Sequence, residues 1–434
     1  YISSLFFTLG GKGSFSAGSA WLKGENSSDN LSCIYCLPSF VSLGYFYGNA
    51  TAVLGFKPHR HEGKVTGLAS RGNVVHNSPL LDIFQISEDG LQINPDYFLD
   101  LYSPFFINAN PGNPPLENLR ELAKTYGRND FAATVQYALE KAVLELVTFL
   151  CSKHQMRNIN LYCSGGIFAN FSLNAVLSRL TFVNSISVTP PMGDAGLPIG
   201  GIVKSIASQH STINKISYSS SAYLGTRYSS DDVLACIEKL NSKHQKFKVV
   251  QVENLAQYAS TLLLNNQIIG IFSGRMEFGP RALGHRSVFA NPSTDKIHDE
   301  LNRRMKRSEF MPFAPITTDE KASSNFQNYQ PGDQCVRFMT KTFICEQLMA
   351  SQVPAAVHCD GTARPQVVNE KDDPALYAFL SDVLELTGLP ALINTSFNAH
   401  EEPIVESPVD ALNSLQAGMV DSLIFNFQFA VEVY

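Results

Sequence analysis

Apolar residues recur at every fourth position along residues 131–150, the spacing of a helix that buries one stripe. Asn129 and Asp130 stand directly ahead of this segment and are expected to cap the helix. A short apolar strand at 159–163 comes next, followed by a glycine turn that opens a second helix. This order favours phosphate binding, because the first amides of a helix point outward without partners. The stripe consists of Phe131, Val135, Leu139, Val143 and Val147.

The second half of the chain resumes the alternation after a polar stretch at 208–230, which carries seven serines between Ser211 and Ser230. Such a stretch is typical of a linker. Beyond it the pattern predicts a helix at 255–264 and a strand at 267–272. Because 434 residues exceed the length at which one core usually splits, we expect an α/β chain of two domains.

A helix start is also expected near the end of the chain. Ser407, Pro408 and Asp410 stand in the order of an N-cap, an N1 proline and an acid at N3. The face that this helix buries is expected to carry Val409, Leu412 and Leu415.

Composition places the chain among ordinary folded proteins, with 44% hydrophobic and 17% charged residues. A net charge of −6 argues against a dedicated nucleic-acid binder, although a local basic patch can exist within an acidic whole. No run of 18 apolar residues could span a membrane, and no basic-then-apolar leader opens the chain. The chain begins at Tyr1 as if within a strand, so we expect it to be cut at this end.

Eight cysteines are scattered along the chain, and only Cys33 and Cys36 form a CxxC. They lie in the apolar run LSCIYCLPSF, which favours buried core thiols on a strand over a metal or redox site. No second pair stands at the spacing of a zinc site. This use of cysteine indicates a reducing compartment, and we expect a cytoplasmic location.

The densest chemical signal is GRMEFGPRALGHRS at 274–287, directly after an apolar strand. Residues 275–309 contain eight Lys/Arg against five acids. Arg281 stands between Gly-Pro and Ala-Leu-Gly, where the backbone is closely fixed. A guanidinium on a stiff turn at a strand end is suited to hold phosphate or carboxylate. Arg303, Arg304 and Arg307 instead suit a solvated basic face of a helix.

Two other segments place polar residues at strand ends in the same half. Arg364 lies within GTARPQ, and NTSFN after the strand LPALI supplies Asn394, Ser396 and Asn398. Open α/β sheets bind ligands at such ends, while turn capping is the alternative for the short polar side chains. In the first half, Asp194 follows a strand in the glycine-rich PPMGDAGLPIGG, where an ordinary turn residue is the simpler interpretation.

These segments together closely resemble the carbamoyltransferase family that includes nodulation and aminoglycoside or cephalosporin O-carbamoyltransferases. The long run GRMEFGPRALG is highly specific, and the other matches are specific in combination. The matches cover almost the whole chain: HEGKVTGLA (61–69), SGGIFAN (164–170), GDAG (193–196), GRMEFGPRALGHRS, SEFMPFAP (308–315), GTARPQ, NTSFN and EEPIV (401–405).

The resemblance implies an actin/hexokinase-like (RNase H-type) transfer domain at 1–215, a lead-in at 216–250 and a YrdC-like twisted α/β domain at 251–434. The second domain would form a carbamoyl-adenylate from carbamoyl phosphate and ATP. The first would pass the carbamoyl group to a hydroxyl of a small-molecule acceptor, helped by a divalent metal, Fe or Zn. A homodimer, no membrane and no nucleic-acid partner complete this expectation.

The resemblance also implies roles for single residues. Arg281, Lys306, Arg364 and Ser396 would hold carbamoyl phosphate and the nucleotide phosphates, with Arg275, Arg286, Asn394 and Asn398 binding substrate or nucleotide. Gly165, Gly166 and Asn170 would lie near a nucleotide in the first domain, and Asp194 would be a metal ligand.

Several departures from the family pattern keep other readings open. The chain has no His-x-x-x-His pair, Gly10 stands where the family has an acid, and Met311 stands where many members have arginine. We therefore expect the N-terminal subdomain to be missing and the transfer site to be incomplete. The alternative is a degenerate or truncated paralogue that binds nucleotide or a partner without transfer. A sugar kinase would account for the first half alone, and a tRNA-modifying role has no support from the charge.

Overall fold

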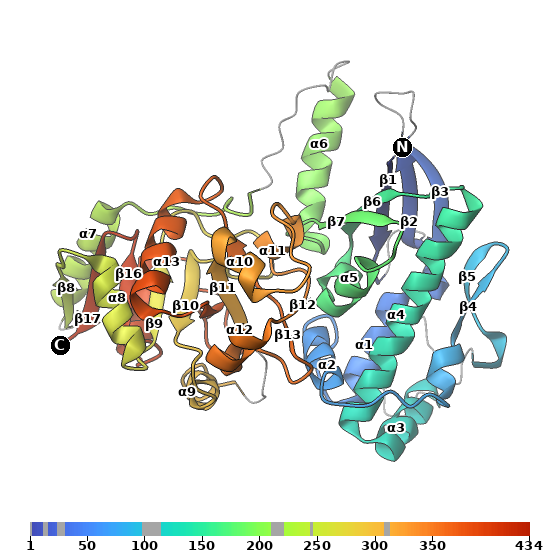
Figure 1. The fold of residues 1–434 in the computed structure, drawn as a ribbon, viewed down its shortest axis with the longest axis horizontal. Coiled ribbons are helices and arrows are strands. Elements are labelled where there is room, and N and C mark those ends of the chain that lie inside the picture. The colour runs from blue at the N-terminus through green and yellow to red at the C-terminus, as the bar shows by residue number, and fades with distance from the viewer. Residues whose placement is uncertain are drawn as a thin grey trace. The chain divides into compact units, whose positions relative to one another are not determined.

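The computed structural model describes residues 2–11, 16–23, 31–97, 114–209, 221–243, 246–307 and 313–434. The chain divides into two compact units (Figure 1). Unit 1 consists of Tyr1–Lys204 with Asp333–Cys335, and unit 2 of Ser205–Gly332 with Val336–Tyr434. Within the described ranges, no helix combines the length and the apolar character that crossing a membrane requires.

Unit 1 is built on a five-stranded mixed sheet in the order β3-β2-β1-β6-β7. Strand β2 runs antiparallel to both β1 and β3, whereas β1, β6 and β7 run parallel. The carboxyl ends of β3, β1, β6 and β7 therefore lie along one edge of the sheet. The strands are β1 (Ser3–Leu9), β2 (Ser16–Lys23), β3 (Leu31–Pro38), β6 (Ile159–Ser164) and β7 (Val183–Val188).

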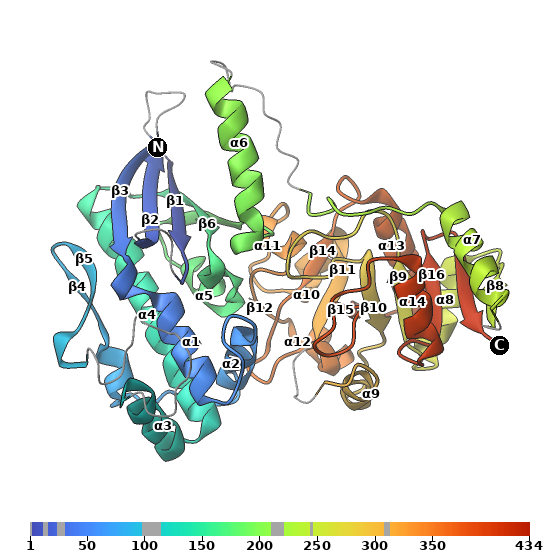
Figure 2. The same ribbon diagram turned by 180° about the vertical axis from the view of Figure 1, so that it is seen from behind.

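The long helix α4 (Arg128–Lys153) forms the centre of the helical layer of unit 1 (Figures 1 and 2). All five residues of the expected stripe are buried on it, which confirms the periodicity. It contacts α1 (Leu43–Val53), α2 (Glu62–Ala69), α3 (Pro114–Tyr126) and α5 (Phe171–Leu177). The rest of the unit comprises η1 (Ser39–Val41), η2 (Pro79–Asp82), β4 (Phe84–Ser87), β5 (Gly90–Ile93), η3 (Pro95–Tyr97), η4 (Gly166–Ala169), η5 (Asp194–Gly196) and the first part of α6 (Leu197–Gln209).

The expected caps of α4 are wrong by one turn. The helix begins at Arg128, and its N-cap is Gly127 with a φ of 79° and no side-chain cap. Glycine accepts this left-handed conformation at little cost. Asp130 lies in the first turn, where its carboxylate accepts a hydrogen bond from the amide of Asn73 at 2.9 Å.

Unit 2 is built on an eight-stranded sheet in the order β14-β11-β15-β10-β9-β16-β17-β8. Helices α8 and α13 cover one face, which Figure 1 shows in front. Helices α7 and α14 cover the opposite face, in front in Figure 2. A separate apolar core fills the space on each side.

The strands and helices of unit 2 and the adjoining segments have the following bounds. The strands are β8 (Phe247–Val250), β9 (Ile269–Phe272), β10 (Arg286–Ala290), β11 (Ala314–Thr318), β12 (Phe343–Ile344), β13 (Thr362–Ala363), β14 (Gln366–Val368), β15 (Leu392–Ser396), β16 (Ser422–Phe425) and β17 (Phe429–Val433). The helices are α7 (Ser230–Asn241), α8 (Leu255–Leu264), α9 (Lys296–Arg304), α10 (Asp319–Asn325), α11 (Gln334–Arg337), α12 (Gln347–Gln352), η6 (Pro354–Ala356), α13 (Pro374–Thr387) and α14 (Pro408–Gln416).

Local expectations for unit 2 are mostly confirmed. Helix α8 and strand β9 lie where the pattern put them, and α14 begins with the expected capping box of Ser407 and Asp410. Its buried face carries Leu412 and Leu415, but Val409 is 39% exposed, so its assignment to that face is wrong. Residues 210–220 of the expected linker lie outside the described residues.

The expectation of core thiols is also wrong for the CxxC pair. Cys33 and Cys36 are free and exposed, although they lie on a strand as expected. The physical reason is position, because β3 is the edge strand of its sheet and much of it faces outward.

Candidate functional site

The loop at 273–285, which joins β9 to β10, is organised by one buried carboxylate. Oε1 of Glu277 accepts hydrogen bonds from the amides of Leu283 at 2.6 Å, His285 at 2.8 Å and Arg286 at 3.1 Å. Glu277 is 7% exposed. Three amides converging on one oxygen fix the loop backbone, because a buried charge that lost them would bear its full desolvation cost.

The carbonyl groups of the same loop are held from the other side. Gln366 donates from Nε2 to the carbonyl of Leu283 at 2.7 Å, and the Tyr223 hydroxyl donates to the same oxygen at 2.8 Å. Asn394 donates from Nδ2 to the carbonyl of Ala282 at 3.2 Å and to Gln366 Oε1 at 2.6 Å. The sequence predicted Asn394 as a ligand residue, and in the structure it contacts the backbone of Ala282, next to Arg281.

His285 fixes the base of the loop. Its Nε2 lies 2.8 Å from Asp373 Oδ2 and its Nδ1 lies 2.7 Å from the carbonyl of Arg275, while the ring stacks on Tyr223. Burial opposes protonation, but Asp373 outweighs it and the pKa of His285 is raised. Gly274 passes so close, with φ +48°, that a Cβ there would lie 2.7 Å from the imidazole.

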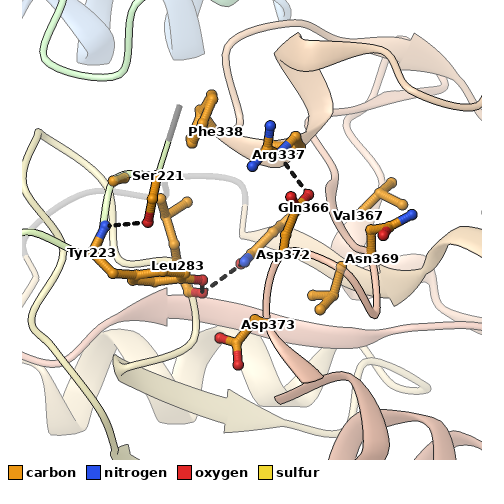
Figure 3. Close-up of a pocket in the computed structure, with 12 residues that line it drawn as sticks. Ser221, Tyr223, Leu283, Arg337, Phe338, Gln366, Val367, Asn369, Asp372 and Asp373 are labelled. Atoms are coloured by element: carbon orange, nitrogen blue, oxygen red, sulfur yellow. Dashed lines mark hydrogen bonds and ion pairs between the residues drawn. The ribbon is translucent and has the colours of Figure 1, made fainter. Parts of the chain in front are cut away.

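A small cavity lies behind this network and is shown in Figure 3. Tyr223, Leu283 and Gln366 line it, as does the ion pair of Arg337 Nε with Asp372 Oδ2 at 2.8 Å. Its volume of about 30 Å³ is enough for one or two water molecules. The cavity therefore belongs to the support of the loop and is too small for a substrate.

Arg281 is a half-buried cation that makes no hydrogen bond or ion pair with any residue the structure describes. Burial lowers its pKa to about 10. Arg364 lies near enough for repulsion: burial first, and then the charge of Arg281, lower the pKa of Arg364 well below its usual range. A desolvated guanidinium without a partner is costly unless an anion binds it, which makes Arg281 a candidate phosphate site.

Two buried histidines, His298 and His358, lie near Arg364. Burial, followed by repulsion from Arg364 and His298, lowers the pKa of His358 to about 4, although Asp360 acts in the opposite direction. His358 is therefore neutral near pH 7 and adds no charge to the cluster.

Arg307 faces strand β15. Its Nη2 donates to Thr395 Oγ1 at 3.0 Å and Ser396 Oγ at 3.4 Å, and its guanidinium lies 5.5 Å from the centre of the Phe313 ring. Burial lowers the pKa of Arg307 to about 10. The sequence assigned Arg307 to a solvated basic face, and the structure shows that assignment to be wrong.

The neighbouring Lys306 is exposed and ends helix α9. It adopts the left-handed conformation with φ 54°. Its amide donates to the carbonyl of Arg303, and the amide of Arg307 donates to the carbonyl of Asn302. This is the Schellman pattern, in which the residue that follows the left-handed one is turned back toward the helix. Lys306 thus sets the direction of Arg307.

Strand β15 brings the two arginine positions together. Asn394 and Ser396 are two residues apart, so their side chains emerge on the same face of the strand. Asn394 holds the loop next to Arg281, and Ser396 accepts from Arg307. Strand β15 therefore contacts both Arg307 and the backbone of the loop that carries Arg281.

Three other predicted ligand residues have backbone partners. Arg286 is fully buried and donates to the carbonyls of Ser273 and His285. Arg275 is exposed and donates to the carbonyl of Gly225 at 3.1 Å. Asn398 donates from Nδ2 to the carbonyls of Ala399 and Glu402, the turn capping that the sequence left as the alternative.

In unit 1, the predicted nucleotide residues form the turn after β6. Gly165 has φ +102°, and a Cβ there would lie 1.9 Å from the carbonyl oxygen of Leu9, whereas Gly166 has open space around it. Asn170 caps α5 by accepting from the amide of Leu173 at 3.1 Å. Its amide group also exchanges two hydrogen bonds with Gln136, at 2.8 and 3.1 Å.

Asp194 lies on η5, exposed, after β7. Within the described ranges, no group of three His, Cys, Asp or Glu side chains is placed to hold a metal ion. These residues do not fit the metal that the family resemblance implies, since a tight transition-metal site needs three or four ligands.

Sequence reasoning missed the contribution of Glu277 and Arg307. The signal for Glu277 was present, as an acid inside a basic glycine-rich loop, but it was counted only toward net charge. Nothing in the local pattern separates Arg307 from Arg303, because the left-handed turn that directs it is set by tertiary contacts.

Two family models match the chain: "Carbamoyltransferase N-terminus" over residues 2–203 and "Carbamoyltransferase C-terminus" over 260–431. An uncharacterized protein of Methanocaldococcus jannaschii is 31% identical over 432 residues, which cover 97% of this chain and 68% of that protein. The nodulation protein NolO of Bradyrhizobium diazoefficiens is 28% identical, with 97% and 74% covered. Among solved structures, full-length HypF in its phosphate- and nucleotide-bound form gives a TM-score of 0.30 at 18% identity, covering 41% of this chain and 22% of that one.

Proposed function

Because the chain belongs to the carbamoyltransferase family, we propose that unit 2 forms a carbamoyl-adenylate from carbamoyl phosphate and ATP. Unit 1 then passes the carbamoyl group to a hydroxyl of a small-molecule acceptor. In this proposal unit 1 has an actin/hexokinase-like (RNase H-type) fold, and unit 2 a YrdC-like fold. The five-stranded mixed sheet of unit 1 and the eight-stranded sheet of unit 2 support it.

The observation that carries the proposal is the state of Arg281. Its loop is held by three amides on Glu277 and by side chains on two carbonyls, yet the guanidinium has no partner among the described residues. A backbone so firmly fixed around an uncompensated cation is preorganised for an anion, and preorganised charge is the strongest general means of stabilising a transition state.

The activation step balances with one water. Water first cleaves carbamoyl phosphate into carbamate and phosphate. A carbamate oxygen then bonds to the α-phosphorus of ATP, the bond from that phosphorus to the bridging oxygen breaks, and pyrophosphate leaves carbamoyl-adenylate behind. Both substrates are polyanions, so bringing them together requires cations that offset phosphate repulsion. Arg281, Arg364 and Arg307 supply these cations, and Ser396 donates or accepts beside Arg307.

Other predicted residues act at the margins of this site. Lys306 is exposed, so its ammonium contributes from solvent at lower strength. Asn394, Arg286 and Asn398 act on the backbone around the site. Arg275 does so through the carbonyl of Gly225.

In the transfer step the acceptor oxygen bonds to the carbamoyl carbon, AMP leaves, and the hydroxyl proton is released. Gly166 offers a backbone amide in the turn after β6, whereas the amide of Gly165 donates to the carbonyl of Met192 at 2.6 Å. Asn170 holds that turn through its cap. A metal, when bound, would polarise the carbamoyl oxygen. The described residues around Asp194 do not provide ligands for such a metal.

The test is release of AMP, or exchange of pyrophosphate into ATP, by the purified chain given carbamoyl phosphate. We expect turnover by the native chain and a loss of one to two orders of magnitude with Arg281→Ala, since a charge-assisted hydrogen bond contributes about 1.5–3 kcal/mol. Arg303→Ala is the matched control, because Arg303 is an exposed arginine paired with Glu300. Equal turnover by Arg281→Ala and the native chain would refute the assignment.

A second candidate is a nucleotide-binding protein without transfer activity. The exposed Asp194 and the lack of a metal-ligand group among the described residues favour it. Calorimetric titration with ATP and carbamoyl phosphate separates the candidates when run beside the turnover assay. Binding without AMP release favours the second, whereas binding with AMP release favours the activation step.

A further inference from the structure

Unit 1 contains a second, larger cavity that none of the chemistry above uses. It lies between the end of β3 with η1 on one side and the β4–β5 hairpin on the other. Its volume is about 630 Å³, within the range of 300–1,000 Å³ that small-molecule sites occupy. The cavity lies wholly within unit 1.

The lining is apolar inside and polar at a few points. Val41 and Leu91 are buried, while Phe40 is 55% exposed, an unusual cost for an aromatic side chain in water. Asp89 is the one charged residue in the described lining, which contains no Lys or Arg. The cavity therefore suits a ligand with an apolar body and few charges, and does not suit a phosphate.

The shape of the cavity is built into the fold. The Tyr35 hydroxyl accepts a hydrogen bond from the amide of Leu91 at 3.1 Å, which ties β3 to the hairpin. The Tyr35 ring lies so close to Gly90 that a Cβ there would be 2.5 Å from it. Burial raises the pKa of Tyr35 to about 12, so the hydroxyl keeps its proton. These contacts fix the positions of the two walls relative to each other before any ligand binds.

Position connects this cavity to the transfer step. It begins where β3 ends, and the carboxyl end of β3 lies on the same sheet edge as the ends of β1, β6 and β7. That edge carries Gly165, Gly166 and Asp194. Ligands of open α/β sheets bind at such edges. Three strand spacings separate β3 from β6, which is about 14 Å.

We propose that this cavity binds the apolar body of the carbamoyl acceptor, an elongated hydroxyl-bearing molecule whose reacting end extends along the sheet edge toward Gly165. That the ligand is the carbamoyl acceptor rests on the proposed function. That the ligand has an apolar body rests on the cavity alone. A compact, highly polar acceptor such as an aminoglycoside would gain little from it.

Two cysteines on β3 provide an internal test. Cys33 and Cys36 are both exposed and free, but only Cys36 lines the cavity. Octyl β-D-glucopyranoside, below its micelle-forming concentration, is the probe, and methyl β-D-glucopyranoside is its control because it has the same sugar without the apolar chain. The maleimide-labelling rate of each thiol is followed by mass spectrometry of its peptide, without ATP or carbamoyl phosphate.

We expect the octyl compound to slow labelling of Cys36 about tenfold at ten times its dissociation constant, by mass action, and to leave Cys33 unchanged. Protection of both thiols, equal protection by the methyl compound, or no protection would each overturn the cavity assignment. Cys36→Trp, which fills the rim, should abolish binding measured by calorimetry, while Cys33→Trp should not.

The assay for AMP release is separate and keeps the two proposals distinguishable. Protection of Cys36 without AMP release would refute the activation step and leave an apolar ligand site. AMP release without protection would refute the cavity assignment and leave the activation step.

Discussion

His285 and Asp373 form an ion pair beneath the arginine loop, with Nε2 and Oδ2 2.8 Å apart. The carbonyl of Arg275 can only accept, so Nδ1 of His285 carries a proton. Asp373 also caps helix α13 by accepting from the amide of Leu376 at 3.1 Å. One carboxylate therefore ties the loop of Arg281 to a helix in the core and raises the pKa of its partner imidazole.

We expect this pair to stabilise the fold more at pH 6 than at pH 9. The pKa of His285 is raised in the folded state, so its contribution is complete below the unfolded value near 6.5 and declines as pH rises through the raised pKa. His285→Gln should lower the unfolding free energy by about 2–3 kcal/mol at pH 6 and by less at pH 9. Urea denaturation at both pH values measures this.

A double-mutant cycle with Asp373→Asn isolates the pair from the other contacts of each residue. The coupling energy should shrink between pH 6 and pH 9. A coupling that does not change with pH would show that the contact between His285 and Asp373 is one of neutral groups.

Glu277 is expected to control activity through the loop, because its Oε1 accepts three amide hydrogen bonds while Oε2 is buried without a hydrogen-bond partner among the described residues. Glu277→Ala removes the acceptor of three amide hydrogen bonds and should lower kcat/KM for carbamoyl phosphate by about one to two orders of magnitude. Glu277→Gln retains one acceptor oxygen, so its kcat/KM should fall less than that of Glu277→Ala. Steady-state AMP release, with folding checked by circular dichroism, provides the measurement.

The control for Glu277 is Glu238→Gln, an exposed acid on α7. The ratio of the activity lost in Glu277→Ala to the activity lost in Glu277→Gln distinguishes a positioning role from global destabilisation. If Glu277→Ala and Glu277→Gln lose equal activity while both remain folded, charge rather than acceptor geometry is responsible.

Arg307 is expected to contribute more than Lys306 to the rate of AMP release. Arg307→Ala removes a half-buried guanidinium from Ser396 and should reduce AMP release by about tenfold or more. Lys306→Ala removes an exposed ammonium and should cost only a few-fold. Assaying both variants under the same conditions checks the order, and a larger loss in Lys306→Ala would restore the role that the family resemblance implies for it.

Lys306→Gly sharpens the comparison, because glycine accepts the left-handed backbone at position 306 without strain. The helix end, and with it Arg307, should keep its geometry, so activity should stay within the range of Lys306→Ala. A collapse of activity in the glycine variant alone would instead implicate the backbone of the turn.

The sequence predicted elements well where one residue type decides the local outcome. The stripe on α4 and the capping box at Ser407 depend on spacing and short-range hydrogen bonds, and both are confirmed. Cys36 was misplaced because burial of a strand depends on whether it lies at the edge of a sheet, and strand order is a long-range property.

The same distinction holds in the candidate site. Arg281 could be singled out from its own motif, because glycine and proline fix the backbone near it. Arg307 could not, because its importance depends on Ser396, which only the folded chain brings near. Glu277 stood out as an acid in a basic loop, but its role as the acceptor of three loop amides depends on the folded backbone.

Gly165 and Gly166 offer a final contrast within one turn. Gly165→Ala would place a Cβ 1.9 Å from the carbonyl oxygen of Leu9 at a φ of +102°, so both overlap and backbone strain oppose it. We expect a loss of about 2–4 kcal/mol in the unfolding free energy. Gly166→Ala has open space at its Cβ and should change stability by less than about 1 kcal/mol. Urea denaturation of both variants decides the matter. Equal stability would mean that Gly165 is free to move away from β1, and the turn after β6 would then be too loose to position a carbamoyl group.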